Sequence, residues 1–345
     1  GRLGTIIDQF LTVGSARDDD EGGEVRTVDD TLNDDDYDEF GLLHENVAEW
    51  GFELDPAFRP ARGAIEVAPG QRLSYIRWSS GGRGDDDVEE PELVLLHGGG
   101  QNAHTWDTFV LKLGRPTIAF DLPGHGRSSR RDDRDYGPWN NATAVAAALD
   151  RLVSSPVVLV GMSLGGATAI RLAATRPDLF RSVVIVDVTP QVNDATREMT
   201  TMERGSVALI SGPPTYDSFE AMAEATIALS PNRPAAAVRR GVRHNAFRLP
   251  DGRWSWRYDL FGPRPEGSEE WADFATLWDD VSAITQPAML VRGGLSKYVL
   301  DEDEAEMRRR LPSIHVEMVD GAGHAVQSDR PMELVELVES FAFAG

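Results

Sequence analysis

The chain has 345 residues, of which 41% are hydrophobic and 26% charged, and its 34 basic and 57 acidic side chains give a net charge of −23. This length and composition predict one large folded domain with an insertion, and the negative charge argues against nucleic-acid or anionic-membrane partners. The absence of cysteine excludes disulfides, thiolate metal sites and a cysteine nucleophile.

No run approaches the roughly 18 apolar residues of a membrane span, and the start lacks the basic-then-apolar layout of a signal peptide. We therefore expect a soluble, cytoplasmic protein.

Residues 1–60 are predicted to form an acidic N-terminal extension. Residues 1–56 hold 17 acidic and 3 basic side chains, so this segment carries more than half of the charge excess. Such a composition favours a solvated tail. The apolar pieces that flank the acidic run could instead be short helices that dock on the main domain or on a second subunit, which would make the protein a homodimer.

Apolar, β-branched runs bounded by turn residues recur from residue 92 onward, with helix-like stretches between them. Being apolar throughout, they are predicted to be buried parallel strands. They lie at 92–98, 116–121, 156–161, 182–187, 287–293 and 314–321. Residues 63–68 and 72–78 resemble an antiparallel pair at one edge. This alternation predicts an α/β fold, a mostly parallel sheet covered by helices on both faces.

About a hundred residues separate the strand that ends at Asp187 from the next strand. Residues 190–280 contain several helix-like stretches with polar breaks, so we predict a helical cap over the sheet. The core would then comprise residues 61–189 and 281–345. Four cap side chains are candidates for the substrate pocket, although each could equally be core: His244, Phe247, Trp254 and Trp256.

The most informative stretch is "VVLVGMSLGGATAIRLA", a β-branched strand that runs into a helix through Gly-x-Ser-x-Gly. This is the context of a nucleophile elbow, a strained turn that needs small neighbours. Ser163 is therefore the predicted nucleophile.

An alcohol needs a base to remove its proton. His324, in the glycine-rich loop "VDGAGHAVQSDRP" after the last predicted strand, is the predicted base.

Acyl transfer by a serine also needs hydrogen-bond donors for the oxyanion of the intermediate. "LLHGGGQNAHTW" ends a strand with three glycines, so its backbone can approach a substrate closely. We expect the N–H groups of Gly99 and Leu164 to be the donors, with Gly98 as the alternative.

Four motifs occur in a fixed order: "HGGG", "DLPGHGRS" at 121–128, "GMSLGG" at 161–166 and "GAGH" at 321–324. With them, residues 63–345 resemble the α/β-hydrolase superfamily. The resemblance implies Ser163 as nucleophile, His324 as base and a cap after the sixth strand. It also implies structural roles for Asp121 and His125.

Such proteins usually carry the catalytic acid three residues after a glycine at the end of the seventh strand. Here Gly293 is followed by Ser296, which cannot supply a negative charge. Asp187, at the carboxyl end of the sixth strand, is the favoured acid, because the ends of neighbouring parallel strands build sites together. Asp301 and Asp303 remain alternatives, but both lie where a helix begins and acidic residues are natural caps.

We therefore predict a serine hydrolase that acts on a small or medium carboxylic ester, thioester or lactone through an acyl-enzyme, without metal or organic cofactor. The glycine loop also resembles that of hydrolases that cleave carbon–carbon bonds in diketone-type ring-cleavage products, which gives one alternative. A non-catalytic ligand receptor on the same fold is another.

Overall fold

The computed structural model describes residues 37–80, 89–192, 199–260 and 273–344. The acidic run as far as residue 36 and most of the acidic loop at 79–92 lie outside the described residues.

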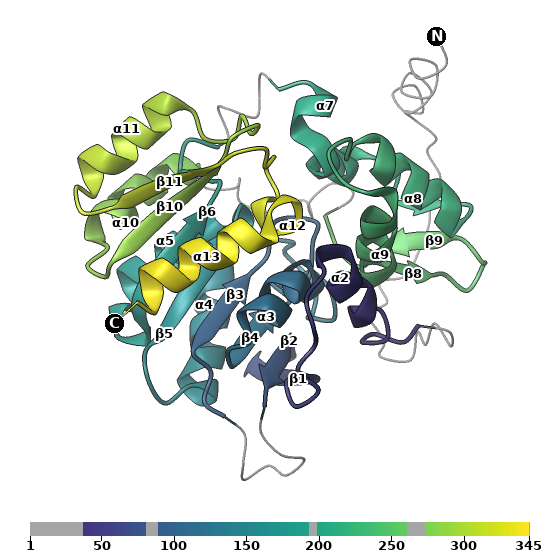
Figure 1. The fold of residues 1–345 in the computed structure, drawn as a ribbon, viewed down its shortest axis with the longest axis horizontal. Coiled ribbons are helices and arrows are strands. Elements are labelled where there is room, and N and C mark those ends of the chain that lie inside the picture. Colours follow the sequence, from purple (N-terminus) through teal and green to yellow (C-terminus); the bar gives the residue numbers. More distant parts are fainter. Residues whose placement is uncertain (1–36, 81–88, 193–198, 261–272, 345) are drawn as a thin grey trace.

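Eight strands form the main sheet: β1 (Arg59–Ala68), β2 (Gln71–Ser79), β3 (Leu93–Leu96), β4 (Thr117–Phe120), β5 (Val157–Met162), β6 (Phe180–Val186), β10 (Ala288–Gly293) and β11 (His315–Val319). Their spatial order is β1-β2-β4-β3-β5-β6-β10-β11 (Figure 1). Pairing is antiparallel from β1 to β2 and from β2 to β4, and parallel across the rest of the sheet. The predicted α/β fold with an antiparallel edge pair is confirmed.

Helices cover both faces of this sheet (Figure 1). One face carries α2 (Leu43–Trp50), α3 (Asp107–Leu113) and α13 (Pro331–Ala342). The other carries α4 (Pro138–Leu152), α5 (Leu164–Thr175), α10 (Leu277–Ala283) and α11 (Asp301–Arg310). The short α12 (Val326–Asp329) precedes α13.

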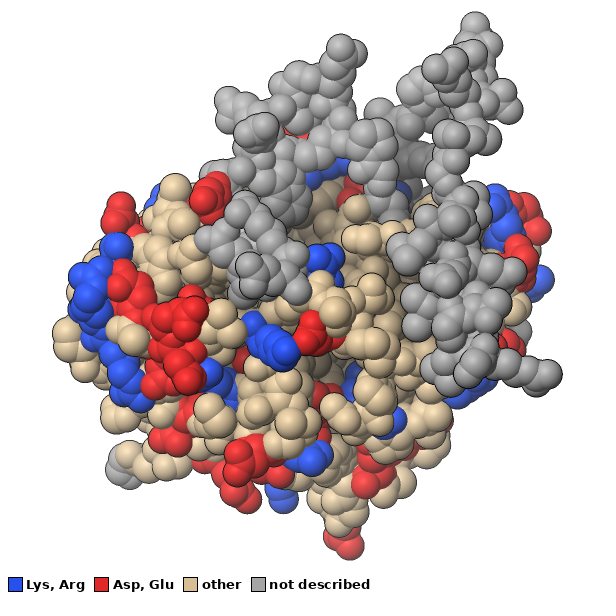
Figure 2. Space-filling view, turned by 90° about the horizontal axis from the view of Figure 1, so that it is seen from above, with Lys and Arg blue, Asp and Glu red and all other residues tan. Residues whose placement is uncertain are grey.

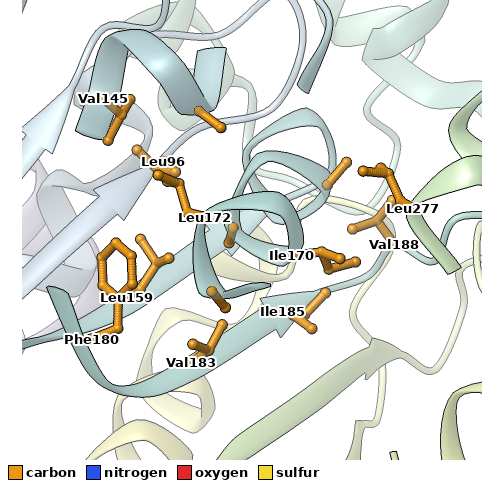
Figure 3. Close-up of a cluster of buried hydrophobic side chains, with 14 of the residues drawn as sticks. Leu96, Val145, Leu159, Ile170, Leu172, Phe180, Val183, Ile185, Val188 and Leu277 are labelled. Atoms are coloured by element: carbon orange, nitrogen blue, oxygen red, sulfur yellow. The ribbon is translucent and has the colours of Figure 1, made fainter. Parts of the chain in front are cut away.

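The central strands are buried on both faces, as their unbroken apolar sequences predict. In β5, Leu159 packs in the apolar cluster on one face, whereas Val158 and Val160 pack on the other. Figure 3 shows how Ile170 and Leu172 of α5 lie against the sheet beside β5 and β6. This packing fixes the strand ends on which the site is built.

The prediction that the last strand is buried is wrong. β11 is an edge strand with one neighbour, β10, and its His315, Glu317 and Met318 are exposed. Because an edge strand packs incompletely, apolar residues in its sequence do not imply burial on both faces.

The solvated-tail interpretation is wrong for the described part of the N-terminal extension. Helix α2 packs on α3, with Leu43 only 8% exposed. The buried amide of Asn46 donates a hydrogen bond to Thr108 Oγ1 at 2.8 Å. Phe58 stacks on Trp78 with ring centroids 5.9 Å apart. The apolar residues that follow the acidic run therefore anchor it to the core.

Between β6 and β10 the chain forms the helices α7 (Thr201–Arg204), α8 (Phe219–Ala228) and α9 (Ala235–Asn245) and the 3₁₀ segment η4 (Gly205–Ser211). It also forms a small antiparallel sheet, absent from the sequence-based expectation, of β7 (Thr215–Tyr216), β9 (Trp254–Trp256) and β8 (Ala246–Arg248). The elements from η4 to β9 share their own apolar cluster, which includes Met222, Val238 and Trp256. They lie at one end of the main sheet (Figure 1).

Acidic and basic side chains lie intermixed on the face of the molecule in Figure 2. Helix α11 illustrates this pattern, since its Arg308 pairs with Glu304 and its Arg309 and Arg310 pair with Glu306. Among the described residues, no helix combines the length and the hydropathy needed to cross a membrane.

Candidate active site

Ser163 occupies the tight turn between β5 and α5. Its backbone has φ 52° and ψ −117°, a strained conformation for a residue with a side chain. The neighbours must be small: a Cβ on Gly161 would lie 2.2 Å from the carbonyl oxygen of Gly165, and one on Gly165 would lie 2.3 Å from that of Leu96. The sequence therefore folds into a turn that lifts the Ser163 hydroxyl above the end of the sheet.

His324 lies on the loop between β11 and α12, and its Nε2 is 3.0 Å from Ser163 Oγ. The imidazole stacks on the ring of Tyr298, with centroids 3.4 Å apart and planes 12° apart. This contact and the hydrogen bonds of its two nitrogens fix the orientation of the ring.

Asp187 follows β6, and its Oδ2 is 2.8 Å from His324 Nδ1. A carboxylate only accepts hydrogen bonds, so Nδ1 carries the proton and Nε2 is left to accept the proton of Ser163. Asp187 is fully buried. Its Oδ1 accepts the N–H of Gly293 at 2.9 Å, and its Oδ2 also accepts the Ser296 hydroxyl.

The other two candidate acids lie in the first turn of α11 instead. Asp301 has a 93% exposed side chain that pairs with Arg292 at 3.0 Å. Asp303 accepts the N–H of Leu300 at 2.9 Å. Asp187 is thus the candidate acid that the structure brings to His324, and Ser296, in the usual acid position, donates a hydrogen bond to it.

The three glycines after β3 differ in what their N–H groups bind. The N–H of Gly98 donates to Gln101 Oε1 at 3.0 Å, and the N–H of Gly100 donates to His125 Nε2 at 3.1 Å. Within the described part of the chain, the N–H of Gly99 has no hydrogen-bond acceptor. A Cβ on Gly98 would lie 3.2 Å from Ser163 Cβ, so this loop runs close to Ser163.

Two buried histidines hold the glycine loop in place. His97 donates from Nδ1 to Gly98 O at 2.7 Å and accepts the Leu122 N–H at 2.9 Å. Burial lowers the pKa of His97, and burial beside the His97 imidazole lowers the pKa of His125 to about 3. Both rings therefore stay neutral, as an acceptor nitrogen requires.

Asp121 ties the "DLPGHGRS" loop to the core. It accepts the N–H groups of Ala103 at 2.8 Å and Arg127 at 3.0 Å, and a donor from Arg62 at 2.9 Å. Burial alone would raise the pKa of Asp121, but Arg62 and these N–H groups lower it. Asp121 and His125 thus have the structural surroundings that the resemblance implies.

A cavity of about 140 Å³ opens beside the glycine loop, between the core and the elements that follow β6. Gly99 and Gly100 lie on its wall, together with Gln327 and Ser328, which follow His324 closely in sequence. Helix α2, η4 and α9 complete the wall. The cavity therefore lies beside the glycine loop and beside the segment that follows His324.

Two of the four predicted pocket residues, His244 and Trp256, lie on the cavity wall. Trp254 packs on Phe219 instead, with centroids 5.3 Å apart. Phe247 lies half-buried under the guanidinium of Arg257. The sequence pattern did not distinguish the two residues that line the cavity, His244 and Trp256, from the two that do not, Phe247 and Trp254.

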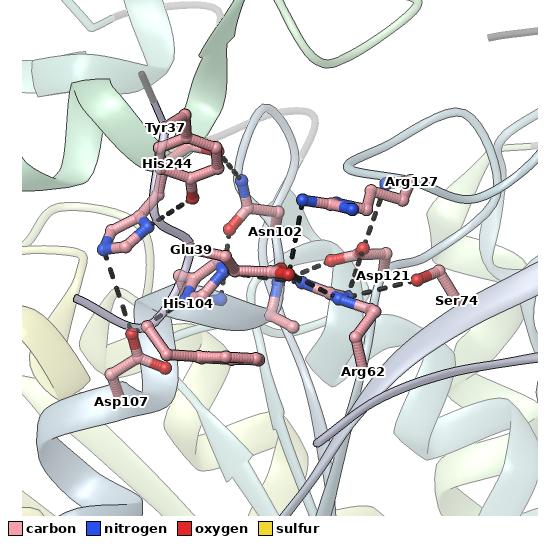
Figure 4. Close-up of polar contacts among 12 residues, drawn as sticks. Tyr37, Glu39, Arg62, Ser74, Asn102, His104, Asp107, Asp121, Arg127 and His244 are labelled. Atoms are coloured by element: carbon pink, nitrogen blue, oxygen red, sulfur yellow. Dashed lines mark hydrogen bonds and ion pairs between the residues drawn. The ribbon is translucent and has the colours of Figure 1, made fainter. Parts of the chain in front are cut away.

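A buried polar network joins the N-terminal segment to this region (Figure 4). Tyr37 OH lies 2.7 Å from His244 Nδ1. Glu39 contacts Arg62 and lies 3.1 Å from His104 Nε2. Burial would raise the pKa of Glu39, but the His104 and Arg62 contacts lower it to about 2.

His104, Asp107 and His244 are the described residues whose ligand atoms come close enough to hold a metal ion, all within 4.8 Å. Their geometry favours a hydrogen-bond network. The two imidazoles stack with planes 12° apart, so their in-plane lone pairs run side by side rather than converging. Asp107 also accepts a hydrogen bond from His104 Nδ1 at 2.8 Å.

Three residues with direct roles in this arrangement were not predicted: Gln101, Ser296 and Tyr298. For Ser296 the signal was present in the sequence, because a hydroxyl in the usual acid position can bind an acid that has moved to the neighbouring strand.

The model of the alpha/beta hydrolase family matches residues 93–337. Esterase Rv0045c of Mycobacterium tuberculosis is 46% identical over 313 residues, which cover 89% of this chain and 97% of that protein. A solved structure of the M. tuberculosis esterase Rv0045c superposes with a TM-score of 0.75 and 44% identity, covering 88% of this chain and 98% of that one. Lipase LipV, also of M. tuberculosis, is 30% identical over 72% of this chain and 92% of its own length.

Proposed function

Because this chain belongs to the alpha/beta hydrolase family, we propose that it hydrolyses carboxylic esters with Ser163 as nucleophile, His324 as base and Asp187 as acid. The proposal rests above all on the hydrogen-bonded chain from Ser163 Oγ to His324 Nε2, at 3.0 Å, and from His324 Nδ1 to Asp187 Oδ2, at 2.8 Å. This order gives the serine a base and gives the base a fixed tautomer.

The geometry supports an acyl-enzyme reaction. Ser163 Oγ attacks the ester carbon while its proton passes to His324 Nε2, and the negative charge of Asp187 stabilises the imidazolium that forms. The oxyanion accepts hydrogen bonds from the N–H groups of Gly99 and Leu164. His324 then protonates the leaving alcohol, and a water molecule activated by the same imidazole hydrolyses the acyl-enzyme.

Gly99 is the preferred loop donor over Gly98, because the Gly98 N–H already donates to Gln101. Leu164 is the first residue of α5, where a backbone N–H has no partner within the helix. This N–H is therefore available to donate a hydrogen bond to the oxyanion.

The two alternatives raised by the sequence are not favoured. The two relatives described above, which match most of the chain at 30% identity or more, are named an esterase and a lipase, which is ester chemistry rather than carbon–carbon cleavage or ligand reception. A cytoplasmic location and a dimer through the N-terminal extension stay predictions. The described part of that extension packs on its own chain.

The test compares wild type with Ser163→Ala on p-nitrophenyl esters of two to eight acyl carbons, followed by matching thioesters and lactones. Wild type should label with a fluorophosphonate at Ser163, and the variant should lose about 10⁴-fold or more in kcat. Ser282→Ala, an exposed serine on α10, is the matched control. Hydrolysis that survives in Ser163→Ala, or label carried by another residue, would contradict the proposal.

A further inference from the structure

Arg233 lies on the cavity wall in the loop between α8 and α9. The backbone of this residue is restricted by the following Pro234, and its N–H donates to Ser230 O at 3.1 Å. Its side chain is 24% exposed. The loop therefore holds a guanidinium at the cavity, largely withdrawn from solvent.

The charge of Arg233 is poorly compensated. Its nearest carboxylate is Asp329, with 3.9 Å between Arg233 Nε and Asp329 Oδ1, too long for a hydrogen bond. The other oxygen of Asp329 accepts the Gly323 N–H at 2.8 Å. Among the described residues, no hydrogen bond from the Arg233 guanidinium is present, although burying a cation is costly unless it is paired and hydrogen-bonded.

The neighbouring cation on the same wall is different. Arg240 lies 2.5 Å from Glu49 and 3.6 Å from Glu45, so two carboxylates neutralise it. Burial and nearby cations hold the pKa of His244 well below its usual value, so this ring is neutral. Arg233 is thus the cation of the described cavity wall that has room for a further anion.

The position of Arg233 relates it to the reacting atoms. The carboxylate of Asp329, its nearest partner, accepts a hydrogen bond from the N–H of Gly323, the residue before His324. Gly99, the proposed oxyanion donor, lies on the wall of the same cavity. Gly99 and Arg233 therefore line one cavity, and a molecule that fills it meets both.

We propose that Arg233 binds a carboxylate of the substrate, so that the preferred substrates are half-esters of small dicarboxylic acids. The planar guanidinium presents paired N–H donors that match both oxygens of a carboxylate. The inference rests on the ester hydrolysis proposed above and names the substrate class of that site.

The net charge of the chain makes the test discriminating. A charge of −23 repels anions at long range, so the field of the whole protein favours a neutral ester over an anionic one. A preference for the anion must then arise locally at the cavity.

The experiment measures kcat/KM for the monomethyl esters of succinic, glutaric and adipic acid, each against the methyl ester in which the free carboxylate is replaced by an uncharged amide. The three chain lengths vary the separation between the ester carbon and the free carboxylate. Wild type should prefer the acid over the matched amide by about 10- to 100-fold for at least one length, mainly through KM. In Arg233→Gln this ratio should fall to about 1.

Arg239→Gln is the matched control, because Arg239 lies on α9, directly after the loop of Arg233, but pairs at the surface with Glu220. It should keep the acid-to-amide ratio of wild type. Arg233→Lys, which keeps the charge but loses the planar pair of N–H donors, should give an intermediate ratio. Fluorophosphonate labelling of Ser163 checks that each variant is folded.

The inference would be overturned if the acid-to-amide ratio of kcat/KM in wild type is near 1 at all three lengths. It would also be overturned if Arg233→Gln keeps the ratio that wild type shows. If Ser163 labels and the esters are hydrolysed without preference for the acid, the carboxylate site alone is refuted. If Ser163 does not label and no ester is hydrolysed, the proposed function itself fails.

Discussion

Replacing Asp187 with asparagine removes one charge from the centre of the site and keeps its volume. The side chain is fully buried and accepts three donors, from His324, Gly293 and Ser296. An amide that keeps its oxygen on Gly293 must turn its NH₂ toward His324 and Ser296. His324 Nδ1 then has to accept, so Nε2 carries the proton and can no longer take one from Ser163.

The structure gives the size of the effect. The imidazolium formed in the reaction lies 2.8 Å from the carboxylate. With an effective dielectric constant of about 20, this attraction is 332/(20 × 2.8), or about 6 kcal/mol. Its loss corresponds to about four powers of ten in kcat, the size expected for the wrong histidine tautomer.

The assay is steady-state hydrolysis of a neutral p-nitrophenyl ester by wild type, Asp187→Asn and Asp301→Asn. Asp301 is an exposed acid at the start of α11, so its variant should lie within about threefold of wild type. An Asp187→Asn enzyme within tenfold of wild type, or a crippled Asp301→Asn enzyme, would refute the reasoning and return the acid to the loop after β10.

Two further predictions concern stability. Glu39→Gln should lower the free energy of unfolding at pH 7 by about 2–4 kcal/mol in urea titrations, because it removes one of the two carboxylates that contact Arg62 and one of the two that contact His104. Glu53→Gln, at an exposed position, is the control, and equal stability of the two variants would argue against an anchoring role. The pKa of His125 is about 3 in the folded protein and about 6.5 in the unfolded chain, so its contribution to stability is intact above pH 6.5 and is lost as the pH falls toward 3. Between pH 7 and pH 5 this loss is about 2 kcal/mol, so the free energy of unfolding should fall correspondingly less in His125→Gln than in wild type. An equal fall in both proteins would contradict the low pKa of His125.

The sequence was sufficient to predict the arrangement of Ser163, His324 and Asp187 because parallel strands bring their carboxyl ends to one edge of a sheet. Once the strand order follows from the alternation of strands and helices, residues at successive strand ends become neighbours. The motif order did not indicate the contacts between loops, such as Tyr298 on His324, because these depend on the path of irregular backbone.

Composition misjudged the N-terminal segment for a related reason. Glu39 contributes to an acidic run in the sequence, but in the fold it meets Arg62, which is 23 residues away, and His104, which is 65 residues away. The charges next to Glu39 in the sequence therefore gave no indication of either partner. The small sheet of β7, β8 and β9 was similarly hard to predict, since strands of two or three residues are too short to show a period-two pattern.

The backbone at Ser163 and at Asp187 has a further consequence. Both residues have φ 52°, in the region that favours glycine, and each such conformation costs on the order of 1–3 kcal/mol. A glycine at either position would relax the chain and abolish the chemistry. Selection for thermal stability alone would therefore tend to remove the proposed nucleophile and the proposed acid, so on this proposal the strain at these two strand ends is stability given up for activity.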